Sequence, residues 1–182
     1  MKKRFTILFY LSILLTFQSQ AQLKWGYKVG LGMSNISRAN TSYGISGGSS
    51  NSKSAFSYQG GIVAETPLKG ENLVLQPALL YCKKGDAVYS KAYLDLPLNV
   101  IVKTTSNIQF GVGPVISFLL SDKVGTNKFI DLGGNILLGY NLTENSSLNF
   151  NYTFSLFNAA KSDYYSDKNI VFGVSLVQFL EK

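Results

Sequence analysis

One pentapeptide in this sequence has the spacing of a catalytic motif. Residues Gly44-Ile45-Ser46-Gly47-Gly48 fit the pattern G-x-S-x-G, which in hydrolases places a nucleophilic serine on a turn between a strand and a helix. Such a serine needs a general base, and the chain contains no histidine. The pentapeptide lies within SYGISGGSSNSKS, a run of small and polar residues typical of a flexible loop. The sequence therefore predicts a loop at this position and no catalytic serine.

Other groups that perform chemistry are few or scattered. Cys82 is the one cysteine, whereas zinc sites combine several cysteine and histidine ligands at set spacings. Asp122, Asp163 and Asp167 could contact calcium in loops, but solvated loop charges are the simpler interpretation. No pairing of lysine or carboxylate residues indicates general acid–base chemistry. We therefore expect a protein that is not an enzyme, with no catalytic, cofactor-binding or metal-binding residues and no cofactor.

The N-terminus has the pattern of a secretory signal peptide. A basic start, Lys2 to Arg4, precedes an apolar run over residues 5–17 and a polar stretch that ends at Ala21. A transmembrane helix would need about 20 apolar residues, and this run is shorter. We predict a signal peptide over 1–21, and no cysteine follows it to carry a lipid. The chain from residue 22 has 14 Lys and Arg against 10 Asp and Glu, a net charge of +4.

Alternation of apolar and mixed residues runs through the rest of the chain. In AYLDLPLNVIVK, residues 92–103, Leu94, Leu96 and Leu98 fall on one face, and Asp95 and Asn99 fall on the other. A period of two over this length is typical of a β-strand with unlike faces. Seven further segments repeat the pattern, at 25–33, 56–65, 73–82, 108–118, 130–140, 148–156 and 170–179.

The faces of these segments differ in charge. All of their ionisable residues lie on the mixed face, namely Lys28, Glu65, Asp95, Lys103 and Asp131. The mixed face is rich in Gly, Ser, Asn and Gln, which suits a narrow packed interior better than a solvated exterior. The segment length matches the roughly 9–11 residues that a tilted strand needs to cross a bilayer. Aromatic residues near segment ends are typical of a membrane interface, and they are Trp25, Tyr27, Tyr58, Tyr81, Phe118 and Tyr140.

These observations predict an all-β fold over residues 22–182, an eight-stranded antiparallel up-and-down transmembrane β-barrel. Short turns are expected near 67–72, 104–107 and 141–147, and longer loops near 35–55, 83–92, 121–128 and 158–168. Both chain ends then lie on the short-turn rim, which is periplasmic in bacterial outer-membrane barrels. The strand prolines lack a ladder donor, so we expect bulges or local breaks at Pro77, Pro97 and Pro114. The five inward charges should plug the lumen, at least some of them as ion pairs.

Four stretches carry a resemblance to a known family: KWGYKVGLGMSNIS, LVLQPALLYCKKG, YLDLPLNVIVK and FGVGPVISFLLSDK. They resemble the small porin-like outer-membrane β-barrel proteins of the Bacteroidetes group, over nearly the whole chain from Lys24 to Phe179. The resemblance implies an eight-stranded barrel and little about activity. Such barrels usually close on a terminal aromatic residue, and Phe179 is the candidate here, followed by Leu180-Glu181-Lys182.

Function is narrowed by compartment and charge. The four longer loops carry nine basic and four acidic residues, so a basic outer rim could pair with outer-membrane lipid, including lipopolysaccharide phosphates. The nine basic residues are Arg38, Lys53, Lys83, Lys84, Lys91, Lys123, Lys128, Lys161 and Lys168. We expect a structural or surface-interaction scaffold in the bacterial outer membrane, with no nucleic-acid partner. The alternatives are a subunit of an envelope secretion or transport complex and, less favoured, a soluble lipocalin-like carrier.

Overall fold

The computed structural model describes residues 23–40, 50–51, 54–70, 72–85, 90–121, 128–157 and 165–180. The predicted signal peptide at 1–21 and the pentapeptide Gly44–Gly48 lie outside these residues, so both stay predictions. No helix in the described residues is long and apolar enough to cross a membrane.

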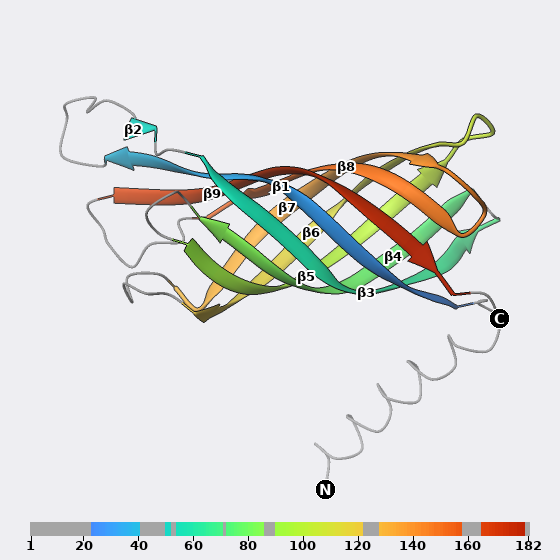
Figure 1. The fold of residues 1–182 in the computed structure, drawn as a ribbon, viewed down its shortest axis with the longest axis horizontal. Coiled ribbons are helices and arrows are strands. Elements are labelled where there is room, and N and C mark those ends of the chain that lie inside the picture. The colour runs from blue at the N-terminus through green and yellow to red at the C-terminus, as the bar shows by residue number, and fades with distance from the viewer. Residues whose placement is uncertain are drawn as a thin grey trace, which may run out of the picture.

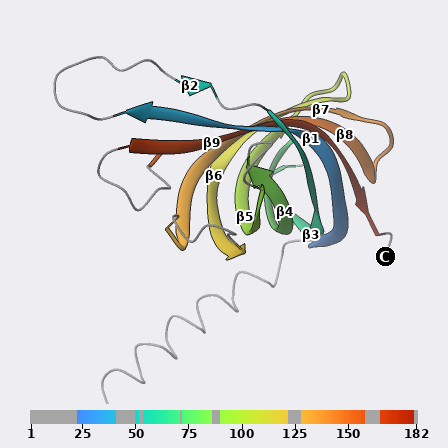
Figure 2. The same ribbon diagram turned by 60° about the vertical axis from the view of Figure 1, so that its left-hand side comes forward.

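The described chain is an antiparallel sheet that closes on itself (Figure 1). The strand β1 pairs with β3 on one side and with β9 on the other, and each further strand pairs with the next along the chain. Figure 2 shows the strands curving round one axis with β1 beside β9. Closure leaves the wall without a free edge, as a barrel in hydrocarbon requires. The strands are β1 Lys24–Asn40, β2 Ser50–Asn51, β3 Ala55–Lys69, β4 Leu73–Gly85, β5 Ser90–Lys103, β6 Ile108–Ser121, β7 Ile130–Asn141, β8 Ser146–Ser155 and β9 Tyr165–Phe179.

Because β2 is a two-residue strand beside β1, eight long strands form the wall. The predicted eight-stranded antiparallel up-and-down barrel is therefore confirmed. Its described ends, Leu23 and Leu180, lie at one rim, where the Leu180 backbone N–H donates to the Trp25 carbonyl at 2.7 Å. The turns between β3 and β4, β5 and β6, and β7 and β8 lie at this same rim (Figure 1). We call it the turn rim, and the opposite end the loop rim.

The two faces of the wall are the reverse of those in a soluble barrel. In β5, Leu96 and Leu98 are 36% and 44% exposed on the outside, while Asp95 between leucines is 6% exposed and faces inward. The pattern holds on every long strand, from Trp25 and Leu31 in β1 to Phe172 in β9, all more than half exposed. The predicted assignment of faces is thus confirmed.

Strand ends differ from the prediction at the loop rim. The expected loop at 83–92 is mostly strand, because β4 runs to Gly85 and β5 begins at Ser90. The expected alternation of short and long connections is therefore wrong at this position. The three predicted short turns are confirmed, and each lies within a few residues of its expected position. Asn107 in one turn and Gly70 in another have φ of 62°, a left-handed conformation that these two residue types tolerate.

Pro77, Pro97 and Pro114 interrupt strand pairing without shifting its register. Pairing between β4 and β5 resumes in the same register on either side of Pro97, and pairing between β5 and β6 does so on either side of Pro114. The pairing of β3 with β4 likewise keeps its register past Pro77. The expectation of bulges or local breaks at these three prolines is confirmed, and each proline makes a local break. Register shifts lie between Pro67 and Lys69, beside the proline near the end of β3, and between Ala92 and Tyr93.

Aromatic rings gather on the outer face toward both rims. Toward the loop rim, the ring centroids of Tyr58 and Tyr81 are 6.3 Å apart, and those of Phe118 and Phe129 are 5.9 Å apart. Toward the turn rim, the exposed aromatic residues are Trp25, Tyr27 and Tyr140. Aromatic residues near the strand ends are typical of a wall that spans a bilayer.

Candidate functional site

The lumen of the barrel holds the buried polar groups and is the candidate site. At the turn rim it opens into a vestibule of about 750 Å³, lined by Lys24, Asn72 and Asn107 among others. At the inner end of the vestibule, Lys103 Nζ lies 2.5 Å from Glu65 Oε1, and Gln76 Nε2 donates to Glu65 Oε2 at 3.4 Å. The charges of Glu65 and Lys103 are therefore paired with each other.

Two apolar clusters narrow the lumen beyond the vestibule. The side chains of Val74, Ile101 and Leu137 form one cluster, each at most 3% exposed. Val63, Val177 and Phe179 form the other. Phe179, the predicted terminal aromatic, ends β9 with its side chain 5% exposed inside the barrel. The backbone partner of Phe179 is Gly26 in β1, which fixes the register of the last strand.

Amide and hydroxyl side chains fill the middle of the lumen. The Lys28 ammonium, 3% exposed as a residue, donates to Asn151 Oδ1 at 2.9 Å. Asn151 Nδ2 in turn donates to Ser175 Oγ at 2.7 Å. Asn135 Nδ2 donates to Asn99 Oδ1 at 3.1 Å. Such neutral groups satisfy one another across strands without the desolvation cost of further charges.

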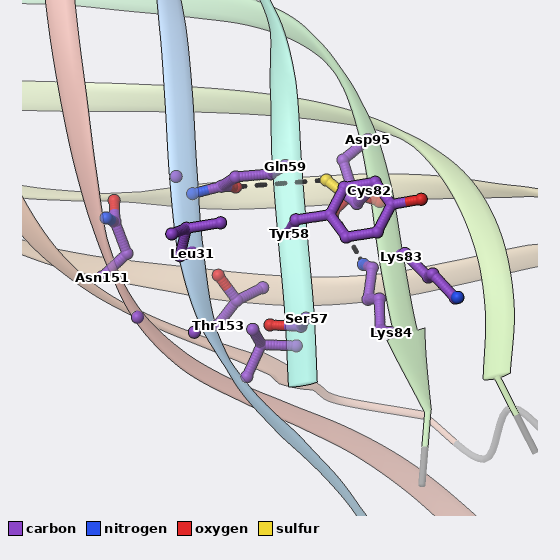
Figure 3. Close-up of a pocket in the computed structure, with 14 residues that line it drawn as sticks. Leu31, Ser57, Tyr58, Gln59, Cys82, Lys83, Lys84, Asp95, Asn151 and Thr153 are labelled. Atoms are coloured by element: carbon purple, nitrogen blue, oxygen red, sulfur yellow. Dashed lines mark hydrogen bonds and ion pairs between the residues drawn. The ribbon is translucent and has the colours of Figure 1, made fainter. Parts of the chain in front are cut away.

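A second ion pair lies toward the loop rim. Lys84 Nζ is 2.7 Å from Asp95 Oδ2, and the two side chains are 5% and 8% exposed (Figure 3). The same ammonium donates to Ser117 Oγ at 3.1 Å and lies 4.8 Å from the centre of the Tyr93 ring. The prediction that Lys84 is a loop residue is therefore wrong. It continues the inward face of β4 past Cys82, and it is the partner that Asp95 requires.

Asp131 is held by neutral donors. Its Oδ2 accepts hydrogen bonds from Ser155 Oγ at 2.6 Å and Asn169 Nδ2 at 3.1 Å. The second carboxylate oxygens, Asp95 Oδ1 and Asp131 Oδ1, are buried without a hydrogen-bond partner among the described residues. Asp95 lines a small cavity of about 30 Å³ together with Gln59 and Lys84 (Figure 3), enough room for a water molecule.

The lumen is therefore a plug of paired polar groups. Of the five charges predicted to face inward, Glu65, Lys103 and Asp95 form ion pairs, and Lys28 and Asp131 bond to neutral groups. The expectation that some of them pair is confirmed. The described residues hold no group of three or more His, Cys, Asp or Glu side chains placed to hold a metal ion.

The distribution of surface charge also differs from the prediction. Lys84 and Lys91, two of the nine basic residues assigned to loops, are each 5% exposed and buried in the barrel. Lys128 and Lys168 are exposed, and Lys83 is partly exposed on the outer face. Arg38 lies in β1, with a side chain outside the description, and Lys53, Lys123 and Lys161 lie outside the described residues.

Comparisons with known proteins support the fold. No protein-family model matches the chain, and no curated protein matches its sequence. The crystal structure of Neisserial surface protein A (NspA) aligns with a TM-score of 0.51 at 16% identity, covering 85% of this chain and 97% of that one. The structure of Ail, the attachment invasion locus protein of Yersinia pestis, aligns at 0.42 with 10% identity, covering 84% and 97%. OprG from Pseudomonas aeruginosa aligns at 0.37 with 10% identity, covering 86% and 96%.

The chain thus has the fold of a small antiparallel outer-membrane β-barrel. This assignment rests on the structural similarity to NspA and on the inverted faces of the wall. The similarities to Ail and OprG are too weak to support it. At 16% identity the likeness shows the fold alone. It does not support the narrower resemblance to the Bacteroidetes family.

Proposed function

We propose that the protein is a non-enzymatic β-barrel of the bacterial outer membrane that acts as a membrane-embedded scaffold. Its loop rim faces the outside of the cell, and both chain ends are periplasmic. The observation that carries the proposal is the inverted wall, with leucines such as Leu96 outward and Asp95 enclosed.

The outer face supports a lipid environment. A soluble monomer seldom exposes a contiguous apolar patch larger than about 600 Å², yet large apolar side chains cover the outside of all eight long strands. Contact with acyl chains removes this surface from water, at roughly 25 cal/mol per Å². The charged residues on the inside then stay out of hydrocarbon.

The filled lumen favours a scaffold function rather than a channel function. Val74 lines the vestibule, and Ile101 and Leu137 form a buried apolar cluster with it inside the barrel. An eight-stranded barrel is only about wide enough to be filled by its own side chains.

The two alternatives fit less well or need a partner. A lipocalin-like carrier would need an apolar interior for its ligand, whereas the described lumen holds buried charges, amides and hydroxyls beside two small apolar clusters. A subunit of an envelope complex would have the same membrane-facing wall. Its binding to partner proteins distinguishes it from the scaffold. We also propose that the chain is a member of the small porin-like barrel family of the Bacteroidetes group, which it resembles.

Membrane fractionation combined with gel electrophoresis tests the function. The full chain, expressed with its signal peptide, should sediment with the outer membrane and resist extraction without detergent. The unheated protein should migrate differently from the boiled protein, because the closed barrel resists unfolding in detergent. Co-purification with fixed neighbours would favour the complex subunit, and recovery in the soluble fraction would refute the proposal.

A further inference from the structure

Lys83 is an exception on the outer wall. Among the described strand side chains, Lys83 and Lys168 are the ionisable groups on the outward face. Lys168 lies beyond the last residue pair between β8 and β9, Phe154 with Ile170. Lys83 lies within the closed wall, paired with Tyr58 of β3 and Ala92 of β5. Figure 3 shows Lys83 and Lys84 leaving β4 on opposite sides.

The neighbours of Lys83 place it at a membrane interface. Its ammonium lies 5.9 Å from the centre of the Tyr58 ring, within the range of a cation–π contact. Tyr81 lies two residues earlier on the same face, and its ring centroid is 6.3 Å from that of Tyr58. Tyrosine rings settle at headgroup level, and an outward lysine is tolerated near the interface but not at the midplane.

We propose that Lys83, together with Tyr58 and Tyr81, binds the phosphate group of a membrane lipid in the leaflet at the loop rim. This inference rests on the proposed function. The ammonium offers three donors and a full charge, and each phenol offers one further donor. Tyr58 and Tyr81 are 40% and 44% exposed, so both are accessible from the lipid side.

The surroundings favour an anion. Ala92, the other cross-strand neighbour of Lys83, presents a methyl group and no competing acceptor. Lys128, an exposed residue that precedes Phe129 in the sequence, adds a second positive charge at the same rim. No outward carboxylate is found among the described side chains of the wall. A phosphate arriving in a lipid headgroup therefore meets positive charge and hydroxyl donors together.

Native mass spectrometry of the folded full chain tests the site. The barrel is prepared in detergent and mixed with lipid A, with phosphatidylglycerol or with phosphatidylcholine, and retained lipid is counted. Lys83→Gln should lower retention of the two anionic lipids about fivefold and leave phosphatidylcholine unchanged. Tyr58→Phe, which keeps the ring and removes the hydroxyl, should give a smaller loss. Lys24→Gln is the matched control, because Lys24 is an exposed lysine at the opposite rim.

The outcomes separate the inference from the function beneath it. Equal retention of anionic lipid by Lys83→Gln and by the unaltered chain would overturn the site. A competition experiment with inorganic phosphate gives a second way to overturn the site. If inorganic phosphate binds alone, displaces lipid A completely and depends on Lys83 to the same extent, the ligand is free phosphate. A chain that forms no heat-resistant barrel in detergent would instead refute the proposed function.

Discussion

Breaking the Lys84–Asp95 ion pair should destabilise the barrel strongly, and by a different amount from each side. The two side chains are 5% and 8% exposed, so solvent screens the pair little. Removing one member of a buried pair costs about 3–5 kcal/mol, because the other charge is left without compensation. The free energy of unfolding measures this cost.

The contacts of each partner predict the order of the two effects. After Asp95→Asn, the Lys84 ammonium keeps Ser117 Oγ and the Tyr93 ring, and the new amide oxygen can still accept. This variant should lie near the lower limit, about 3 kcal/mol. After Lys84→Met, the Asp95 carboxylate loses its cation, and its Oδ1 already has no hydrogen-bond partner among the described residues. That variant should lie near about 5 kcal/mol.

The double variant isolates the pair. With Asp95→Asn and Lys84→Met together, no charge is stranded, and the remaining cost is that of a poorly bonded buried amide, about 1–3 kcal/mol. Because the two single costs sum to about 8 kcal/mol, the coupling between the two substitutions should be about 5–7 kcal/mol. Glu65→Gln provides a comparison at the other pair, where the Lys103 side chain is 23% exposed and can hydrate. Its cost should stay below about 2 kcal/mol.

Urea unfolding of the full chain in vesicles gives these free energies. Trp25, the single tryptophan, lies 53% exposed on the outer face and reports departure from lipid. Unfolding and refolding curves must coincide for the values to be compared. The reasoning fails if Lys84→Met costs less than about 1 kcal/mol, or if the two single effects add in the double variant.

Three further predictions follow from the wall and the lumen. Leu96→Arg should lower stability in vesicles by about 2–4 kcal/mol if residue 96 lies near the midplane, and unchanged urea unfolding would place it outside hydrocarbon. Gly61→Ala should destabilise the barrel more than Gly60→Ala, because a Cβ at Gly61 would lie 2.0 Å from the Leu79 carbonyl oxygen and one at Gly60 meets no atom closer than 3.9 Å; equal urea midpoints would contradict this. In planar bilayers the protein should show no stepwise conductance like that of a sixteen-stranded porin run as a control, because the Val74 cluster closes the lumen, and stable large steps would refute a plugged barrel.

Much of the fold was predictable because a strand repeats every two residues. Leu94, Leu96 and Leu98 alternate with Asp95 and Asn99, and this pattern alone assigns both faces of β5. The low number of inward charges then distinguishes a membrane wall from a soluble one. The number of strands follows from counting such segments, and closure follows because an open edge is costly in lipid.

The ends of the strands and the partners of the charges were harder to predict. The sequence Lys83-Lys84-Gly85 has the composition of a loop, yet alternation continues along it and sends Lys83 outward and Lys84 inward. That Lys84 meets Asp95 depends on the register of β4 against β5, where Leu80 is opposite Asp95. A lysine side chain then reaches back along its strand to the carboxylate. Neither the strand register nor the reach of the lysine side chain can be read from the composition. The continued alternation was a signal that β4 extends past Cys82.

The central claim is that the apolar face of the wall meets lipid and that the polar face packs inside the lumen. Spin labels at Leu96→Cys, Leu98→Cys and Val100→Cys, in a Cys82→Ser background, test it in vesicles against Asn99→Cys and Ile101→Cys. The outward positions should collide readily with oxygen dissolved in lipid and rarely with a water-soluble nickel complex, while labels at residues 99 and 101 should be shielded from both. Frequent nickel collisions at residues 96, 98 and 100 would contradict the inverted barrel.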